Sequence, residues 1–175
     1  MDNEPEIRAT TARDVPHLKA LYERAFPDEN LAPLVERLLA EVPDILSLVA
    51  VNGDQLLGHV LFTPCRVGEG ERKVALLAPL AVAPSHQRQG VGSALVREGF
   101  NRLCRSGLRQ VLVLGDPSYY GRFGFRTETS IVPPYILPRE WSDAWQSAKL
   151  DERTEALAGK LRPPAAWLSP ALWAP

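Results

Sequence analysis

The sequence has few cysteines and almost no excess of charge of either sign. Its 175 residues include two cysteines, Cys65 and Cys104, which are too few for a disulfide framework. With 20 Lys and Arg against 21 Asp and Glu, the formal net charge is −1, so the dense basic face of a duplex nucleic-acid binder is not expected. No apolar run is long enough to span a bilayer, and the acidic first residues lack the apolar core of a signal peptide. We expect a cytoplasmic monomer or homodimer that binds neither nucleic acid nor membrane.

Several familiar catalytic and phosphate-binding motifs are also missing. A dinucleotide fingerprint needs a third glycine three positions after Gly92, where the chain has Leu95,. A Walker loop needs a Gly-Lys pair, and no lysine lies between Lys73 and Lys149,. The Gly-x-Ser-x-Gly elbow of the α/β-hydrolases is absent,. No cluster of His, Cys and Asp has metal-ligand spacing, so no metal is expected.

Hydrophobic periodicity predicts one mixed α/β (α+β) domain. We expect Thr11 to be the N-cap of the first helix, with Asp14 completing a short capping box. A strand, a helix and a further strand form a crossover that makes the strands at 74–82 and 111–114 parallel neighbours. The expected elements are strands at 6–8, 45–51, 56–67, 74–82 and 111–114, helices at 15–26 and 31–39, a helix from Gly92 to about Arg105, and a helical turn at 119–123 leading into a last strand.

The end of the chain has a different composition. Seven prolines punctuate the stretch from Pro133 to Pro175, which also contains all four tryptophans. Tryptophans have large apolar areas to bury, so this stretch is not expected to be disordered. A strand is predicted at 141–150 and a short helix at 152–160. We therefore expect a domain at 1–130 and a Pro/Trp-rich extension at 131–175, packed on the same domain and adding a strand.

A glycine-containing loop at a strand-to-helix junction is the clearest candidate for chemistry. It reads Gln87-Arg88-Gln89-Gly90-Val91-Gly92-Ser93. Glycines let the backbone approach a ligand closely, and the first N–H groups of the following helix have no partners within that helix. Such a junction suits a phosphate group, with Arg88 as a nearby cation. A solvated loop that merely begins a surface helix has the same local composition.

Two motifs together resemble the GNAT superfamily of N-acetyltransferases. The pattern Gln/Arg-x-x-Gly-x-Gly/Ala follows a strand that ends Leu80-Ala81-Val82-Ala83-Pro84. The pattern Tyr-x-x-x-Gly-Phe occurs as Tyr120 to Phe125, and the order of elements from Glu6 to Thr129 also agrees. The longer run from Gly115 to Phe125 is similar to the YhbS-type subgroup of predicted bacterial N-acetyltransferases. The resemblance implies the GNAT acyl-CoA N-acyltransferase fold, a mixed, mostly antiparallel central sheet flanked by helices.

The resemblance also implies a co-substrate and residues that hold it. GNAT enzymes bind acetyl-CoA between two splayed parallel strands, here 74–82 and 111–114. By this resemblance Tyr120 occupies the position of a general acid; the structural alternative is an aromatic packing residue. Arg122 either reaches a CoA phosphate or is solvated. The implied acetyl-CoA contacts are Leu80, Ala81 and Val82 for the pantetheine arm and Gln87, Arg88, Gln89, Gly90, Val91, Gly92 and Ser93 for the pyrophosphate.

The resemblance leaves the general base and the acceptor open. Many GNAT enzymes place a glutamate on the central strand, but the segment from Val74 to Leu80 contains no carboxylate. His59 and Asp116 are candidates, each with a structural alternative. The expected reaction is direct attack of a primary amine, on a small molecule or a peptide, upon acetyl-CoA or a longer acyl-CoA. A non-catalytic acyl-CoA-binding or sensing module is the alternative.

Overall fold

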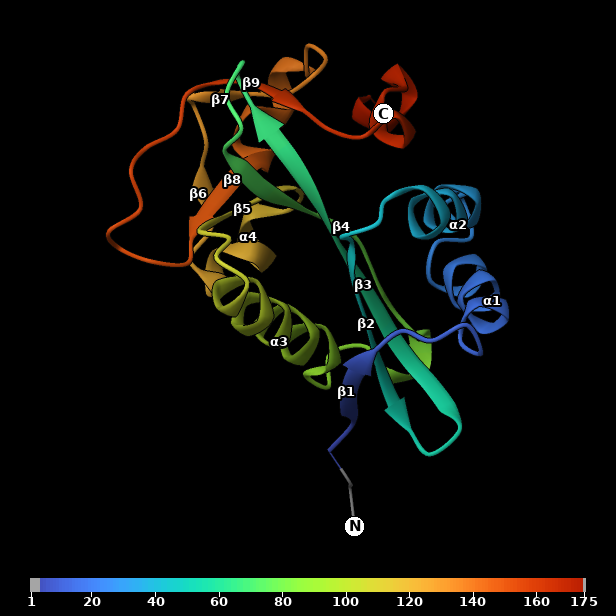
Figure 1. Ribbon diagram of the computed structural model, residues 1–175. Helices are drawn as coiled ribbons and strands as arrows, with labels where there is room; N and C mark the ends of the chain where they lie inside the picture. Colours follow the sequence, from blue (N-terminus) through green and yellow to red (C-terminus); the bar gives the residue numbers. More distant parts are fainter. Residues whose placement is uncertain (1–3, 175) are drawn as a thin grey trace. The chain divides into compact units, whose positions relative to one another are not determined.

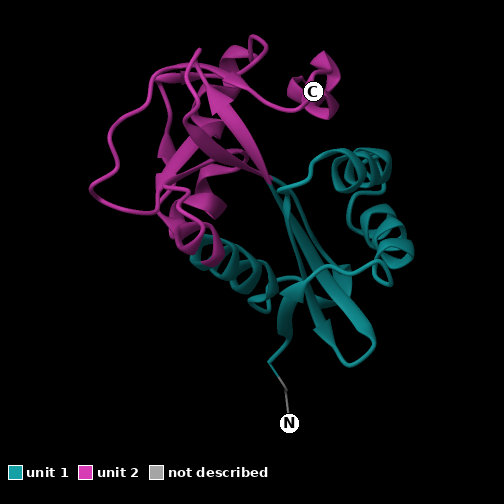
Figure 2. Ribbon diagram, in the orientation of Figure 1, with its two compact units in different colours: residues 1–62, 78–101 teal, residues 63–77, 102–175 magenta. Residues whose placement is uncertain are grey.

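The computed structural model describes residues 4–174. They fall into two compact units, which Figure 2 colours separately: unit 1 comprises residues 4–62 and 78–101, and unit 2 comprises residues 63–77 and 102–174. The helices and strands, labelled in Figure 1, are β1 (Glu6–Ala9), α1 (Val15–Ala25), α2 (Ala32–Glu41), β2 (Leu46–Asn52), β3 (Gln55–Val67), β4 (Lys73–Val82), α3 (Val91–Arg105), β5 (Gln110–Leu114), α4 (Pro117–Tyr120), β6 (Arg126–Thr127), β7 (Ile131–Val132), β8 (Trp145–Lys149) and β9 (Gly159–Arg162). Short 3₁₀ turns include Pro84–His86, Gly121–Phe123 and Arg139–Ala144.

Unit 1 is built on the antiparallel strands β1, β2 and β3, with the second half of β4 next in the strand order. The register of β2 and β3 runs from Leu46 opposite Phe62 to Asn52 opposite Gln55. Only Gly53 and Asp54 lie between these paired residues, so the two strands form a tight β-hairpin,. The strands are nearly all apolar because both of their faces are covered by helices.

The alternation of side chains along β3 explains the two covered faces. A Cβ built on Gly58 would lie 3.0 Å from a methyl carbon of Leu95, and one built on Gly99 would lie 2.2 Å from the ring of Phe62. Gly58 and Phe62 therefore face α3. His59 points the other way, toward Tyr22 of α1. The helix α1 also lies beside α2 (Figure 1).

Unit 2 contains the parallel pair that the sequence predicts. Ala75 of β4 pairs with Val111 of β5, and Leu76 pairs with Leu112. On its other side β5 pairs antiparallel with β8, and β8 in turn pairs with β6. The residues after 130 thus supply a strand that lies between β5 and β6, while β9 pairs with β3. The mixed, mainly antiparallel sheet with flanking helices confirms the predicted fold class.

Three of the four tryptophans form the core of the last segment. The ring of Trp173 lies 5.8 Å from that of Trp145 and 6.1 Å from that of Trp167, in edge-on arrangements. Each buried indole N–H has an acceptor: the carbonyl of Ile131 for Trp145, Thr63 Oγ1 for Trp167 and the Trp167 carbonyl for Trp173. These contacts explain why a proline-rich stretch is ordered.

Local predictions were wrong at three places. Helix α1 has Asp14, not Thr11, at its N-cap; the Asp14 carboxylate accepts the Thr11 N–H at 2.7 Å, so only half of the expected capping box forms,. No helix occurs at 152–160, where the chain leads into β9 instead. Residues Arg139–Ala144 form a 3₁₀ turn, so the predicted strand at 141–150 begins only at Trp145.

Candidate functional site

The glycine loop of unit 1 connects β4 to the N-terminus of α3. The N–H of Ala94 donates to the carbonyl of Gly90 at 3.0 Å, so the helical hydrogen-bond ladder starts there. The N–H groups of Val91, Gly92 and Ser93 belong to the first turn, which has no acceptors within its own helix. The dipole of this 15-residue helix adds partial positive charge at the same end,. The loop therefore offers several oriented donors to an anion.

The backbone of the loop adopts an unusual conformation. Arg88 has a φ of +62° and Gly90 a φ of +86°, both in the left-handed region. This conformation costs glycine little, but in a residue with a side chain it stores about 1–3 kcal/mol of strain. A Cβ built on Gly90 meets no atom within 4 Å. The space beside Gly90 is therefore open, so an anion can approach the backbone of the loop there.

Side-chain amides brace the loop from within. Gln87 Nε2 donates to the carbonyl of Val82 at 3.1 Å, and Gln89 Nε2 donates to the carbonyl of Ser85 at 3.2 Å. Both residues and Arg88 are exposed, whereas Val91 and Gly92 are buried. Gln87 thus holds the loop against the end of β4, and Gln89 holds it against the turn Pro84–His86. The Arg88 side chain stays at the surface.

The strand segment Leu80-Ala81-Val82 lies directly before this loop. Ala81 is buried, and Leu80 and Val82 are half-buried. The carbonyl oxygen of Ala81 lies 3.0 Å from a Cβ built on Gly58, so the backbones of β3 and β4 approach closely at this point. Unit 1 therefore contains both the loop residues and the strand residues that the sequence assigns to acetyl-CoA.

Tyr120 and Arg122 lie in unit 2, in the turn that follows β5. Asp116 caps this turn by accepting the N–H of Ser118 at 2.9 Å and its hydroxyl at 2.8 Å. The same bonds lower the pKa of the Asp116 carboxyl. Asp116 is therefore a capping residue, which is the structural alternative that the sequence left open.

The ring of Tyr120 is enclosed by aromatic neighbours. It lies 5.0 Å from the ring of Tyr119 and 5.6 Å from that of Phe125, both edge-on. Burial, and to a lesser degree the neighbouring Tyr119, raises the pKa of Tyr120. The phenol is therefore protonated at neutral pH and is a hydrogen-bond donor.

The Arg122 side chain is held within the same turn. Its Nε donates to the carbonyl of Tyr119 at 2.9 Å, and its guanidinium carbon lies 4.5 Å from the centre of the Tyr119 ring. These two contacts hold the guanidinium group over the Tyr119 ring,. The residue is exposed.

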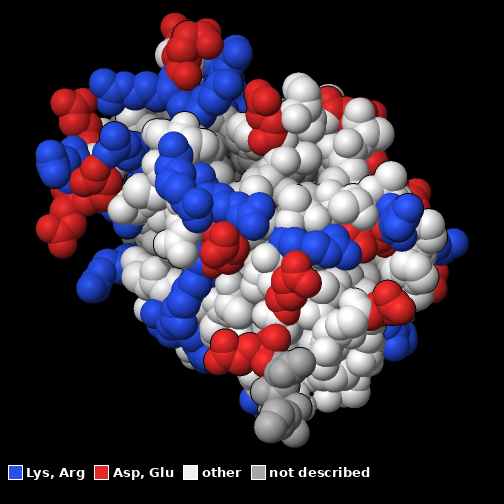
Figure 3. Space-filling model, turned by 60° about the horizontal axis from the view of Figure 1, so that its bottom comes forward, with Lys and Arg blue, Asp and Glu red and all other residues white. Residues whose placement is uncertain are grey.

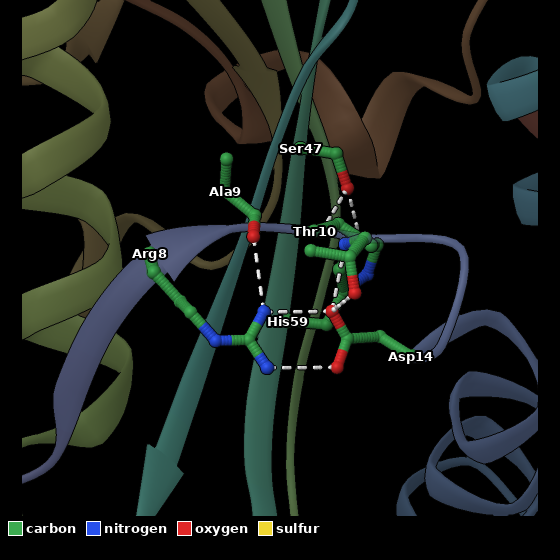
Figure 4. Close-up of polar contacts among 7 residues, drawn as sticks. Arg8, Ala9, Thr10, Asp14, Ser47 and His59 are labelled. Carbon is green, nitrogen blue, oxygen red and sulfur yellow. Dashed lines mark hydrogen bonds and ion pairs between the residues drawn. The ribbon is translucent and has the colours of Figure 1, made fainter.

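His59 has both ring nitrogens engaged inside unit 1. Nδ1 lies 2.7 Å from the hydroxyl of Tyr22, and Nε2 lies 2.8 Å from the hydroxyl of Ser47. Ser47 in turn lies 2.6 Å from the Thr10 hydroxyl, as the close-up in Figure 4 shows. Burial lowers the pKa of His59 to about 3. These contacts are those of a neutral structural histidine.

This network of Thr10, Ser47, His59 and Tyr22 was missed by sequence reasoning. Tyr22 lies 37 residues from His59 in the chain, and Ser47 lies 12 residues from it. No local motif links such positions. One signal in the sequence pointed to such a network: His59 lies in an otherwise apolar strand. A polar side chain buried there needs hydrogen-bond partners.

Of the two free cysteines, Cys65 is buried and Cys104 is exposed. Burial raises the pKa of the Cys65 thiol to about 12, so it stays protonated,. Within residues 4–174 no group of three His, Cys, Asp or Glu is placed to hold a metal, and no helix is long and apolar enough to cross a membrane. Basic and acidic side chains are interspersed on the face shown in Figure 3.

Residues 6–127 match the family model described as an acetyltransferase (GNAT) domain. The chain therefore belongs to the GNAT acetyltransferases, which confirms the resemblance seen in its motifs. It is 34% identical to the uncharacterized N-acetyltransferase YjhQ of Escherichia coli K12 over 160 residues, which cover 87% of this chain and 88% of YjhQ.

Two solved structures with a bound co-substrate are also similar. YhbS of Escherichia coli, crystallised in complex with CoA, matches with a TM-score of 0.86 and 29% identity over 97% of this chain and 96% of YhbS. A GNAT acetyltransferase from Brucella melitensis in complex with acetyl-CoA matches with a TM-score of 0.76 and 29% identity, over 93% and 97% of the two chains.

Proposed function

We propose that this protein transfers an acetyl group from acetyl-CoA to a primary amine by direct attack. The observation that carries the proposal is the loop before α3, where left-handed backbone at Arg88 and Gly90 leads directly into the first turn of the helix. Membership of the GNAT family and similarity to CoA-bound relatives support the same co-substrate.

The chemistry of the loop fits a pyrophosphate. We assign Gln89 to Ser93 to the phosphate oxygens, through backbone N–H groups that need no excess of basic side chains. Gln87 shapes the loop, and we assign Arg88 and Arg122 to CoA phosphates as cations. In the same proposal Leu80, Ala81 and Val82 pair with the pantetheine arm through their backbone.

The transfer itself moves one acyl group and two protons. The amine nitrogen bonds to the thioester carbonyl carbon, the carbon–sulfur bond breaks, and the sulfur leaves with the bonding electron pair. A backbone N–H near Leu80 would stabilise the oxyanion that develops on the carbonyl oxygen. We assign to Tyr120 the donation of a proton to the leaving sulfur, a role that its protonated phenol supports.

The second proton must leave the amine. β4 carries no carboxylate, and the ring nitrogens of His59 are already hydrogen-bonded. We propose that this proton passes to water, so that amines with a low pKa react fastest. The acceptor class stays a small molecule or a peptide with a primary amine, and the site in the cell is the cytoplasm.

A second candidate is a non-catalytic acyl-CoA-binding or sensing module. The lack of a carboxylate on β4 favours it. In either case we propose that residues 1–130 form the GNAT domain, that residues 131–175 form an extension of it, and that the protein works as a monomer or a homodimer.

One experiment separates the two candidates. The purified protein is mixed with acetyl-CoA and a broad panel of primary amines, and thiol release is followed while binding of CoA is measured by calorimetry. Amine-dependent thiol release supports the transferase. Tight CoA binding without transfer to any amine would favour the sensor, and absence of CoA binding would overturn both.

A further inference from the structure

The ring of Tyr120 lies directly against the backbone of Gly115, at the end of β5. A Cβ built on Gly115 would lie 2.4 Å from Cε2 and 2.8 Å from Cδ2 of Tyr120. These distances are too short for any carbon–carbon contact, so a side chain at this position would displace the ring. The position of the Tyr120 ring therefore depends on where the Gly115 peptide lies.

Gly115 is held on both sides, by Ala144 just before β8 and by Gln146 within β8. Its N–H donates to the carbonyl of Ala144 at 2.9 Å, and its carbonyl accepts from Gln146 Nε2 at 3.1 Å. The same Nε2 reaches the Ala144 carbonyl at 3.4 Å. The Gln146 amide therefore bridges the two carbonyls at the end of the β5–β8 pair.

Gln146 is 1% exposed, so its bond to Gly115 is shielded from water. If the amide is removed, the Gly115 carbonyl loses this donor and cannot recover its full hydrogen bonding without moving. Such movement is transmitted along the chain. Asp116 directly follows Gly115, and its carbonyl accepts the N–H of Tyr120. The contact therefore links β8 to both the ring and the backbone of Tyr120.

We propose that Gln146 is a positioning residue for Tyr120, so that the segment after residue 130 takes part in the transfer step. This inference rests on the proposed function, in which Tyr120 donates a proton to the leaving sulfur. Gln146 acts by holding Gly115, which in turn fixes the place of the phenol ring. A reacting group displaced by about 1 Å can lose much of its effect on the rate.

The kinetic test replaces Gln146 by Leu, which keeps a side chain of similar size without an N–H donor. We expect kcat to fall about tenfold and the KM for acetyl-CoA to change less than about twofold. In a Tyr120→Phe background the same replacement should lower kcat by less than about twofold, because the positioned hydroxyl is already gone. Equal losses in both backgrounds would overturn the proposal.

A spectroscopic test does not depend on activity. The chain has four tyrosines, so the ¹⁹F spectrum of fluorotyrosine-labelled protein is simple, and the Tyr120 signal is the one lost in Tyr120→Phe. This signal should shift in Gln146→Leu and in Gly115→Ala. It should stay in place in Ser147→Ala, a control that removes only the neighbouring bond to Glu128.

The two tests separate failure of this inference from failure of the proposed function. If the wild-type protein transfers acetyl to no amine, the proposed function fails, and the role of Gln146 is decided by the ¹⁹F shifts alone. If Gln146→Leu does not fold, Gln146→Glu, which keeps the size of the side chain and loses the N–H donor, carries both measurements. An unmoved Tyr120 signal in the folded variants overturns the inference.

Discussion

His59 Nδ1 lies 2.7 Å from the hydroxyl oxygen of Tyr22, and both side chains are buried. The contact joins β3 to α1, and the bond from His59 Nε2 to Ser47 joins β3 to β2. A single neutral imidazole therefore connects three elements of unit 1.

This contact predicts how stability depends on pH. Burial lowers the folded-state pKa of His59 from 6.5 to about 3, so below pH 6.5 the unfolded chain takes up a proton that the folded chain does not. The free energy of unfolding should therefore fall as pH decreases toward 3, at up to about 1.4 kcal/mol per pH unit. Urea unfolding between about pH 7 and pH 4.5 measures this slope. It should flatten in His59→Gln and persist in His17→Gln, whose histidine is exposed; equal slopes in the two variants would contradict the assignment.

The ion pair between Arg8 and Asp14 predicts a second, more acidic pH range in which stability is lost. Arg8 Nη1 and Nη2 contact the two carboxylate oxygens of Asp14 at 2.7 and 2.9 Å (Figure 4), and the Arg8 bond is the main cause that lowers the Asp14 pKa. The stabilisation from this ion pair is fully present above pH 3.8, the pKa of Asp14 in the unfolded chain, and is lost as pH falls below that value,. Asp14→Asn should cost about 1–3 kcal/mol at neutral pH.

The matched control for Asp14 is the exposed pair of Arg37 and Glu41, at 2.9 Å on one helix. Glu41→Gln should change the free energy of unfolding by less than about 0.5 kcal/mol. A similar cost for the two variants would show that the part-buried position of Asp14 has no special effect.

Replacing Gly99 by Ala should destabilise unit 1, although alanine is the better helix former. A Cβ at this position would lie 2.2 and 2.3 Å from Cε2 and Cζ of Phe62, which is fully buried. Overpacking costs about 1–3 kcal/mol, against a gain of about 1 kcal/mol in helix propensity. A net loss in urea unfolding is expected. Gly121→Ala, where a Cβ meets nothing within 4 Å, should be close to neutral, and a stabilised Gly99→Ala would contradict the packing.

Tyr120→Phe tests the proposed proton donor. We expect kcat to fall about 100-fold, because a general acid is lost, while the Kd for CoA changes little. Tyr119→Phe is the matched control, since its ring packs in the same aromatic group. Small and equal effects of the two variants would remove Tyr120 from the mechanism.

Arg88 combines a charge with a left-handed backbone, and two substitutions separate these properties. Arg88→Ala removes the charge and keeps the strain at φ +62°, whereas Arg88→Gly removes both. Both should weaken CoA binding by a similar factor, and Arg88→Gly alone should raise the free energy of unfolding by about 1 kcal/mol. Calorimetry at low and high salt measures how much the Arg88 charge contributes to CoA affinity. Unchanged CoA affinity in both variants would exclude Arg88 from the binding site.

The elements around the glycine loop were predictable because their signals are local. Alternating and periodic apolar residues define β4, α3 and β5, and the crossover rule makes β4 and β5 parallel,. The loop motif itself is contiguous, from Gln87 to Ser93. Fold class and candidate loop therefore followed from neighbouring residues.

Features that depend on distant pairing were not predictable in the same way. The residues at 152–160 have helix-forming composition, yet Gly159 and Lys160 pair with Ile131 and Val132 in β7. Tertiary pairing here overrides local propensity. The bond from Gln146 to Gly115 likewise joins residues 31 positions apart, and no spacing rule predicts it.

The position of β8 between β5 and β6 also bears on how the chain is made. Since β8 follows β6 in the sequence, a growing chain completes β5 and β6 well before Trp145–Lys149 leaves the ribosome. Throughout that interval the backbone N–H and C=O groups on this edge of β5 have no strand to pair with. A strand of another nascent chain can hydrogen-bond to them. Pairing of β8 with β5 is therefore the step that removes this exposed edge,.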